Sequence, residues 1–156
     1  MRTPIDQDYD VLSLIQISTE EEIYLVDPYN AKHPQIKAIF KEYFGNKNKT
    51  VIGHTIYDDV GTVADFFEIG RPTCKIIDIK KEYEGLNSSK QVGLKSISKE
   101  ILGKEICKKY TMTNWDRRPL NLCQLHYAAM DAYIILKIWD KLSLMIEERK
   151  KNPNPI

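Results

Sequence analysis

Residues 124–139 read Gln124-Leu-His-Tyr-Ala-Ala-Met-Asp-Ala-Tyr-Ile-Ile-Leu-Lys-Ile-Trp139. The apolar residues of this stretch recur at the spacing of an amphipathic helix, so it predicts a helix with one buried face. Within that helix Tyr127 and Asp131 are four residues apart and therefore share a face, with the phenol beside the carboxylate. A tyrosine and an aspartate held rigidly in this way can orient a water molecule and bind a divalent metal ion.

Further segments lie upstream of this helix. The nearest is Asn114-Trp-Asp-Arg-Arg-Pro-Leu120, and before it comes Gly93-Leu-Lys-Ser-Ile-Ser-Lys-Glu-Ile-Leu-Gly-Lys-Glu-Ile-Cys-Lys108. Nearer the N-terminus, the apolar runs at 11–17 and 23–27 predict two strands joined by a short turn. We interpret Trp115 and Arg118 as structural residues rather than as partners that stack on bases.

Taken in order, these segments resemble the DnaQ-like 3'-5' exonucleases, in the tyrosine-bearing (DEDDy) branch that includes the Werner-type and RNase D-like members. The pattern from Tyr127 to Asp131 is similar to the third exonuclease motif of that branch. The resemblance covers the chain from about Val11 to about Lys141. It implies an α/β fold, namely an RNase H-like mixed sheet flanked by helices.

The composition describes one globular domain. The chain has 156 residues, of which 42% are hydrophobic and 29% are charged, enough for a single core. There is no long apolar segment and no signal-peptide pattern, so we expect no membrane association and an intracellular location, in the nucleus or the cytoplasm. Cys74, Cys107 and Cys123 lack the number and spacing of a disulfide framework or a zinc site, and we interpret them as buried or incidental thiols.

Charge is distributed unevenly along a chain whose net charge is only +1. Residues 1–30 hold one basic and seven acidic residues, whereas residues 74–118 hold eleven basic and six acidic residues. The second stretch is either a face that neutralises phosphates or an ordinary solvated lysine-rich surface.

Alternating strands and helices complete the prediction of an α/β domain. We expect a domain at 11–149, preceded by a loop or remnant at 1–10 and followed by a disordered tail at 150–156. Within it the pattern predicts a helix from Pro34 to Gly45, a strand at 50–53, a helix at 59–67, a strand at 74–79, a polar loop at 84–90, and helices at 94–102 and 122–149.

A second candidate site lies at Val51–Val63. Asp59 precedes the apolar Val63 by four residues, which is the spacing of the second family motif, whereas Asp58 precedes Thr62 and fits less well. Either acid can instead be a helix cap or a first-turn residue stabilised by the helix dipole. His54 is either a partly buried polar residue or a contact to a bound nucleotide.

The resemblance implies hydrolysis of phosphodiester bonds at the 3' ends of RNA or single-stranded DNA. Two ions, Mg²⁺ or Mn²⁺, would lie about 3.5–4 Å apart and stabilise the attacking and departing oxygens. By resemblance, Asp131 ligates one ion, Asp59 helps to hold the second, and Tyr127 orients the attacking water. Hard oxygen ligands suit these ions.

One family motif is missing from this pattern. The family carries an Asp-x-Glu pair on its first strand, and the only candidate here is Asp6-Gln-Asp8, where Pro4 interrupts a strand. We therefore expect this segment to be the loop before the second strand and the sheet to lack its first strand, the alternative being that Asp6-Gln-Asp8 is a divergent first motif. Two functions remain open, an exonuclease that is truncated and weakly active, or an inactive exonuclease-fold module that binds nucleic acid or protein partners.

Overall fold

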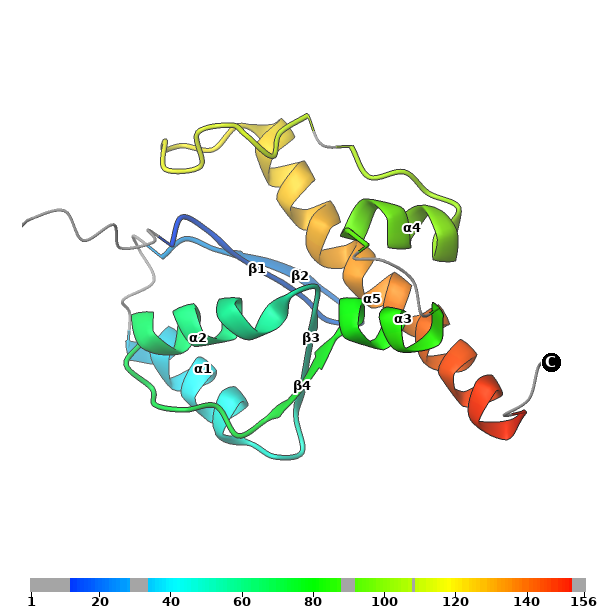
Figure 1. The fold of residues 1–156 in the computed structure, drawn as a ribbon. Helices are drawn as coiled ribbons and strands as arrows, with labels where there is room; N and C mark the ends of the chain where they lie inside the picture. The colour runs from blue at the N-terminus through cyan, green and yellow to red at the C-terminus, as the bar shows by residue number, and fades with distance from the viewer. Residues whose placement is uncertain (1–11, 29–33, 88–91, 108, 153–156) are drawn as a thin grey trace, which may run out of the picture.

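The computed structural model describes residues 12–28, 34–87, 92–107 and 109–152, so Asp6 and Asp8 lie outside the described residues. Its strands and helices follow one another as expected for an α/β domain (Figure 1). In chain order they are β1 (Ile15–Ser18), β2 (Ile23–Val26), α1 (Pro34–Gly45), β3 (Thr50–Gly53), α2 (Ile56–Phe66), β4 (Lys75–Asp78), α3 (Ile79–Asn87), α4 (Leu94–Leu102) and α5 (Leu122–Lys151).

The strands form two separate pairs. β1 and β2 are antiparallel, with Ile15 opposite Val26, whereas β3 and β4 are parallel, with Val51 opposite Ile76. The predicted mixture of strand directions is therefore confirmed. Within the described residues no further strand joins the two pairs.

Helices cover both sides of the strand pairs (Figure 1). On one side, α1 and α2 pack their aromatic and aliphatic residues against the strands, and the Phe40 ring stacks on that of Phe67 with centroids 4.8 Å apart. On the other side, α3, α4 and α5 share a second cluster that includes the fully buried Ile97 and Ile138. Burial of these two clusters is the main source of stability for the domain.

The predicted boundaries differ from the observed ones at several elements. β1 begins at Ile15 rather than at 11 and ends at Ser18, and β2 ends at Val26 rather than at 27. α2 begins at Ile56 rather than at 59, and α5 continues through Lys151. The predicted strand at 74–79 ends at Asp78, and the next residues form α3, which replaces part of the predicted loop at 84–90. Ile79 and Tyr83 are buried one helical turn apart, so tertiary packing overrides the turn-forming residues of this segment.

An ion pair anchors the segment that leads into α5. Arg118 donates from Nε and Nη2 to the two carboxylate oxygens of Asp27, both at 2.9 Å, and from Nη2 to the carbonyl of Ser13 at 2.7 Å. Such a two-pronged bond fixes orientation as well as distance. The contact ties the start of α5 to the ends of β1 and β2, which agrees with a structural role for Arg118.

Candidate active site

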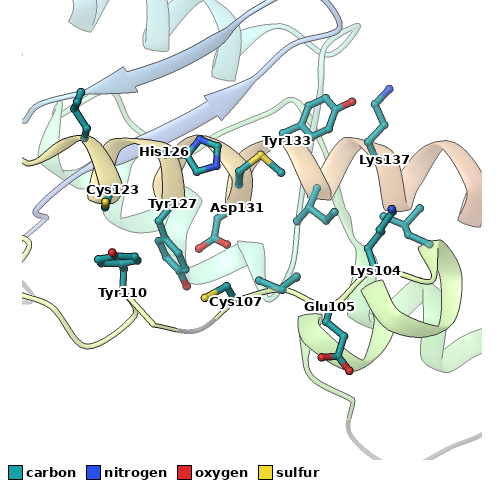
Figure 2. Close-up of a pocket in the computed structure, with 15 residues that line it drawn as sticks. Lys104, Glu105, Cys107, Tyr110, Cys123, His126, Tyr127, Asp131, Tyr133 and Lys137 are labelled. Carbon is teal, nitrogen blue, oxygen red and sulfur yellow. The ribbon is translucent and has the colours of Figure 1, made fainter.

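α5 begins at a well-formed cap. The Asn121 side chain accepts a bond of 2.9 Å from the amide of Gln124, whose own side chain accepts one of 3.1 Å from the amide of Asn121. This reciprocal capping box satisfies two backbone donors at the helix start. Because the helix starts here in a defined register, Tyr127 and Asp131 project from α5 toward the segment that carries Cys107 and Tyr110 (Figure 2).

Aromatic rings and a hydroxyl surround Tyr127. The Tyr110 ring lies 6.2 Å from the Tyr127 ring, and the Trp115 ring lies 6.0 Å from it, measured between centroids. The Tyr127 hydroxyl lies 2.8 Å from Oγ1 of Thr111, within hydrogen-bond distance. These contacts hold the phenol in one place, and the contact of Trp115 with Tyr127 agrees with a structural role for Trp115.

The electrostatics of the pair reflect partial burial. Burial raises the pKa of the Asp131 carboxyl above its ordinary value, and a hydrogen bond from the Tyr127 hydroxyl opposes that rise. Burial also raises the pKa of Tyr127, the Thr111 bond lowers it, and the charge of Asp131 raises it further. A nearby cation stabilises the charged form of a carboxylate that is partly removed from water in this way.

The second acidic group lies in the first turn of α2, directly after β3. Asp58 and Asp59 are both exposed, and partial desolvation followed by repulsion from Asp58 raises the pKa of Asp59. The turn before them is unusual, because Thr55 adopts a left-handed backbone with φ of 54°. Its amide donates to the buried carboxylate of Asp78 at 3.0 Å, which holds the turn in place.

The structure brings some of the candidate residues together but not all of them. Tyr127 and Asp131 line one pocket, whereas Asp58, Asp59 and His54 do not line it. His54 is partly buried, with Nε2 3.5 Å from the carbonyl oxygen of Val92, which agrees with its interpretation as a partly buried polar residue.

The pocket beside Tyr127 and Asp131 has a volume of about 800 Å³ (Figure 2). It lies between α5 and the segment that connects α4 to α5, and most of its lining is apolar or aromatic. Its lining residues are Leu102, Lys104, Glu105, Ile106, Cys107, Tyr110, Leu122, Cys123, His126, Tyr127, Met130, Asp131, Tyr133, Ile134 and Lys137. A concave apolar surface with a few polar groups is typical of a ligand site.

The acidic side chains fit a divalent cation in part. Carboxylate oxygens are ligands that Mg²⁺ and Mn²⁺ prefer, and no ion pair joins Asp59 or Asp131 to a lysine or arginine in the described part of the chain. No three acidic, histidine or cysteine side chains come together as a metal-binding group among the described residues. The donor chemistry is therefore suitable, but the ligand set is incomplete there.

Sequence reasoning missed three residues that shape these sites. Thr111 and Tyr110 contact Tyr127 across the α4–α5 connection, and Asp78 holds the turn before α2. The only sequence signal for Asp78 was an acid within an apolar strand, which indicates a buried polar partner.

The three cysteines fall into two groups. Cys74 is buried in the core, as expected, whereas Cys107 and Cys123 are exposed and line the pocket. Among the described helices, none is long and apolar enough to cross a membrane.

Comparisons with known proteins show the family to which the chain belongs. A family model described as 3'-5' exonuclease matches residues 2–147. Ribonuclease D of Haemophilus influenzae is 32% identical over 145 residues, which cover 91% of this chain and 34% of that protein. Exonuclease mut-7 of Caenorhabditis elegans is 24% identical over 161 residues, which cover 90% of this chain and 18% of that protein. The chain thus spans about a third or less of the length of these two relatives.

Solved structures show the same fold. The crystal structure of Escherichia coli RNase D, described as an exoribonuclease involved in structured RNA processing, matches with a TM-score of 0.74 and 27% identity. That match covers 88% of this chain and 36% of the other. The EXO domain of Aedes aegypti Nibbler matches with a TM-score of 0.71 and 22% identity, covering 87% of this chain and 71% of that domain. These neighbours confirm the predicted RNase H-like fold.

Proposed function

From the premise that this chain belongs to the DnaQ-like 3'-5' exonuclease family, we propose that it hydrolyses phosphodiester bonds at nucleic-acid 3' ends with Tyr127, Asp131 and Asp59. The observation that carries the proposal is the position of Tyr127 and Asp131, which lie together in the pocket on the first half of α5. Position and chemistry thus agree with the third motif of the tyrosine-bearing branch.

Each residue has a distinct role in this proposal. Asp131 would ligate one divalent ion, Mg²⁺ or Mn²⁺, and Asp59 would help to hold a second one, through water. When bound, the ions supply the positive charge that stabilises the oxygens entering and leaving the phosphate. Tyr127 would accept a hydrogen bond from the attacking water at its phenolic oxygen and so orient the water.

The pocket is a suitable place for the 3'-terminal nucleotide. Tyr110 and Tyr133 supply aromatic rings on which a base can stack, and stacking of this kind tolerates any base. Lys104 and Lys137 also line the pocket and can attract phosphates. We propose RNA as the preferred substrate, because the matched Escherichia coli RNase D is described as an exoribonuclease.

The rate of the chain as given is expected to be low. Asp59, Tyr127 and Asp131 are three of the groups that the family uses, and within the described residues no acidic pair completes a cluster with them. We therefore propose a weakly active exonuclease. The alternative, an inactive module that binds RNA or protein partners through the same surface, is favoured by the same incomplete ligand set.

A labelled single-stranded oligonucleotide tests the proposal. The chain should shorten a strand with a free 3' end and leave a strand with a blocked 3' end intact. The shortening should require Mg²⁺ or Mn²⁺. Asp131→Asn should abolish the cleavage, whereas the matched control Asp65→Asn, on the exposed side of α2, should leave it unchanged. Binding of the strand without any metal-dependent shortening would instead support the inactive module.

A further inference from the structure

Thr111 makes a contact that the proposed chemistry does not yet use. Its Oγ1 lies 2.8 Å from the Tyr127 hydroxyl, and the two residues are 16 positions apart in the sequence. Thr111 lies on the connection between α4 and α5, whereas Tyr127 lies on α5. The contact is therefore made by the fold and not by helical spacing.

The contact occupies one side of the phenolic oxygen. Either hydroxyl can be the donor in this pair. In both cases Thr111 takes up one hydrogen-bonding direction of the Tyr127 hydroxyl.

The phenolic oxygen keeps a further direction for a water molecule. A phenolic hydroxyl can both donate and accept, so the contact with Thr111 does not use all of its hydrogen-bonding directions. The rings of Tyr110 and Trp115 lie 6.2 Å and 6.0 Å from the Tyr127 ring, measured between centroids, and restrict where the phenol can move.

We propose that Thr111 is a positioning residue that orients the hydroxyl of Tyr127 toward the attacking water. This inference rests on the proposed function, because it names a residue that acts on the same reaction through Tyr127. Thr111 is exposed, so its methyl group adds little to the core and its hydroxyl makes the relevant contact.

The test compares kcat and KM for cleavage of a labelled single strand by the full chain, with Mn²⁺. Thr111→Val removes the hydroxyl and keeps the shape, and should lower kcat roughly tenfold with KM within about twofold, because the reacting groups lose alignment. Thr111→Ser keeps the hydroxyl and should restore kcat to within about twofold. In a Tyr127→Phe background, Thr111→Val should have almost no further effect, since the partner is already gone.

A matched control separates positioning from a general loosening of the segment. Thr113 lies two residues away. Its hydroxyl donates to the carbonyl of Tyr110 at 2.9 Å and accepts a bond of 3.3 Å from the side-chain amide of Gln124, so its removal loosens the segment without removing a bond to the Tyr127 hydroxyl. Thr113→Val should leave kcat within about twofold. An equal fall in kcat for Thr113→Val and Thr111→Val, or a full fall for Thr111→Val in the Tyr127→Phe background, would overturn the positioning role.

A measurement that needs no cleavage distinguishes failure of the positioning role of Thr111 from failure of the proposed exonuclease function. The unfolding equilibrium constants of the Thr111→Val, Tyr127→Phe and double variants should show a coupling of roughly fivefold, the size of a typical net hydrogen bond. Coupling together with no cleavage by the unmodified chain would overturn the proposed function and with it the positioning role. Cleavage that Thr111→Val leaves unchanged would overturn the positioning role alone.

Discussion

The carboxylate of Asp78, only 5% exposed, accepts a hydrogen bond of 3.0 Å from the backbone amide of Thr55. The same oxygen accepts a second bond of 3.0 Å from the amide of Lys80, at the start of α3. One buried oxygen therefore joins the end of β4 to the turn that starts α2. This turn directly precedes Asp58 and Asp59 in the first turn of α2. Asp78 therefore connects the buried end of β4 to the segment that bears these two acids.

Removal of that oxygen should destabilise the domain. Asp78→Ala leaves the backbone amides of Thr55 and Lys80 without this partner, and we expect a loss of about 1–3 kcal/mol in the free energy of unfolding. Asp78→Asn keeps the accepting oxygen and should lose about 1 kcal/mol or less. Urea denaturation monitored by circular dichroism measures both, and equal losses for the two variants would contradict the role given to this oxygen.

The glycine before this turn is equally constrained. A Cβ at Gly53 would lie 2.7 Å from Cβ of Ile56, closer than carbon atoms approach, so Gly53→Ala should cost about 1–3 kcal/mol of stability. Gly61, inside α2, is the matched control, because a Cβ there meets nothing within 4 Å. Gly61→Ala should stabilise the domain by about 0.5–1 kcal/mol through helix propensity. The melting temperatures of both variants, compared with that of the unmodified chain, test these two expectations.

The ionised Asp131 side chain should lower the stability of the folded domain, although the proposed activity depends on it. Burial raises its pKa above the ordinary value of 3.8, so the ionised form costs free energy in the folded state. Below the pKa that Asp131 has in the unfolded chain, the carboxyl is protonated in both the folded and the unfolded state, and the cost disappears. As the pH rises through the higher pKa of the folded state, the folded state loses stability. Asp131→Asn should therefore unfold at a higher temperature than the unmodified chain at pH 7, and at the same temperature at pH 3. A melting temperature at pH 7 that is unchanged or lower would contradict this account.

The basic region at 74–118 should make nucleic-acid binding sensitive to salt. Affinity for a labelled single strand should fall with a slope near −0.7 per neutralised phosphate. Lys104→Ala and Lys109→Ala, both on exposed residues, should each make the slope shallower by about 0.7. Lys37→Ala, on α1, is the control, and Arg118 is excluded because it is bonded to Asp27. Binding that does not change with salt would show that this region is an ordinary solvated surface.

Adding a strand that ends in Asp-x-Glu should raise the rate of cleavage. A version of the chain extended by a strand that ends in Asp-x-Glu should degrade 3' ends at least about 10³-fold faster, which corresponds to ~4 kcal/mol of transition-state stabilisation. The comparison needs both Mg²⁺ and Mn²⁺. If instead the present chain is already fast and Asp6→Ala or Asp8→Ala abolishes cleavage, Asp6-Gln-Asp8 is the first motif.

The sequence alone determined the parts of this protein that depend on short spacings. Tyr127 and Asp131 share a face because residues four apart always do so in a helix. The order of the segments predicted the family and the fold, which the comparisons confirm. The same local reasoning failed at α3, because Ile79 and Tyr83 become a buried helical face only when α4 and α5 pack against them.

Tertiary structure decided the contacts that set the orientation of those groups. Thr111 meets Tyr127 across 16 residues, Asp78 meets Thr55 across 23, and Arg118 meets Asp27 across 91. No periodicity encodes such pairs, since each depends on where the chain returns after several helices and strands. Local spacing thus indicated which side chains are candidates for the chemistry, and long-range packing fixed the contacts that orient them.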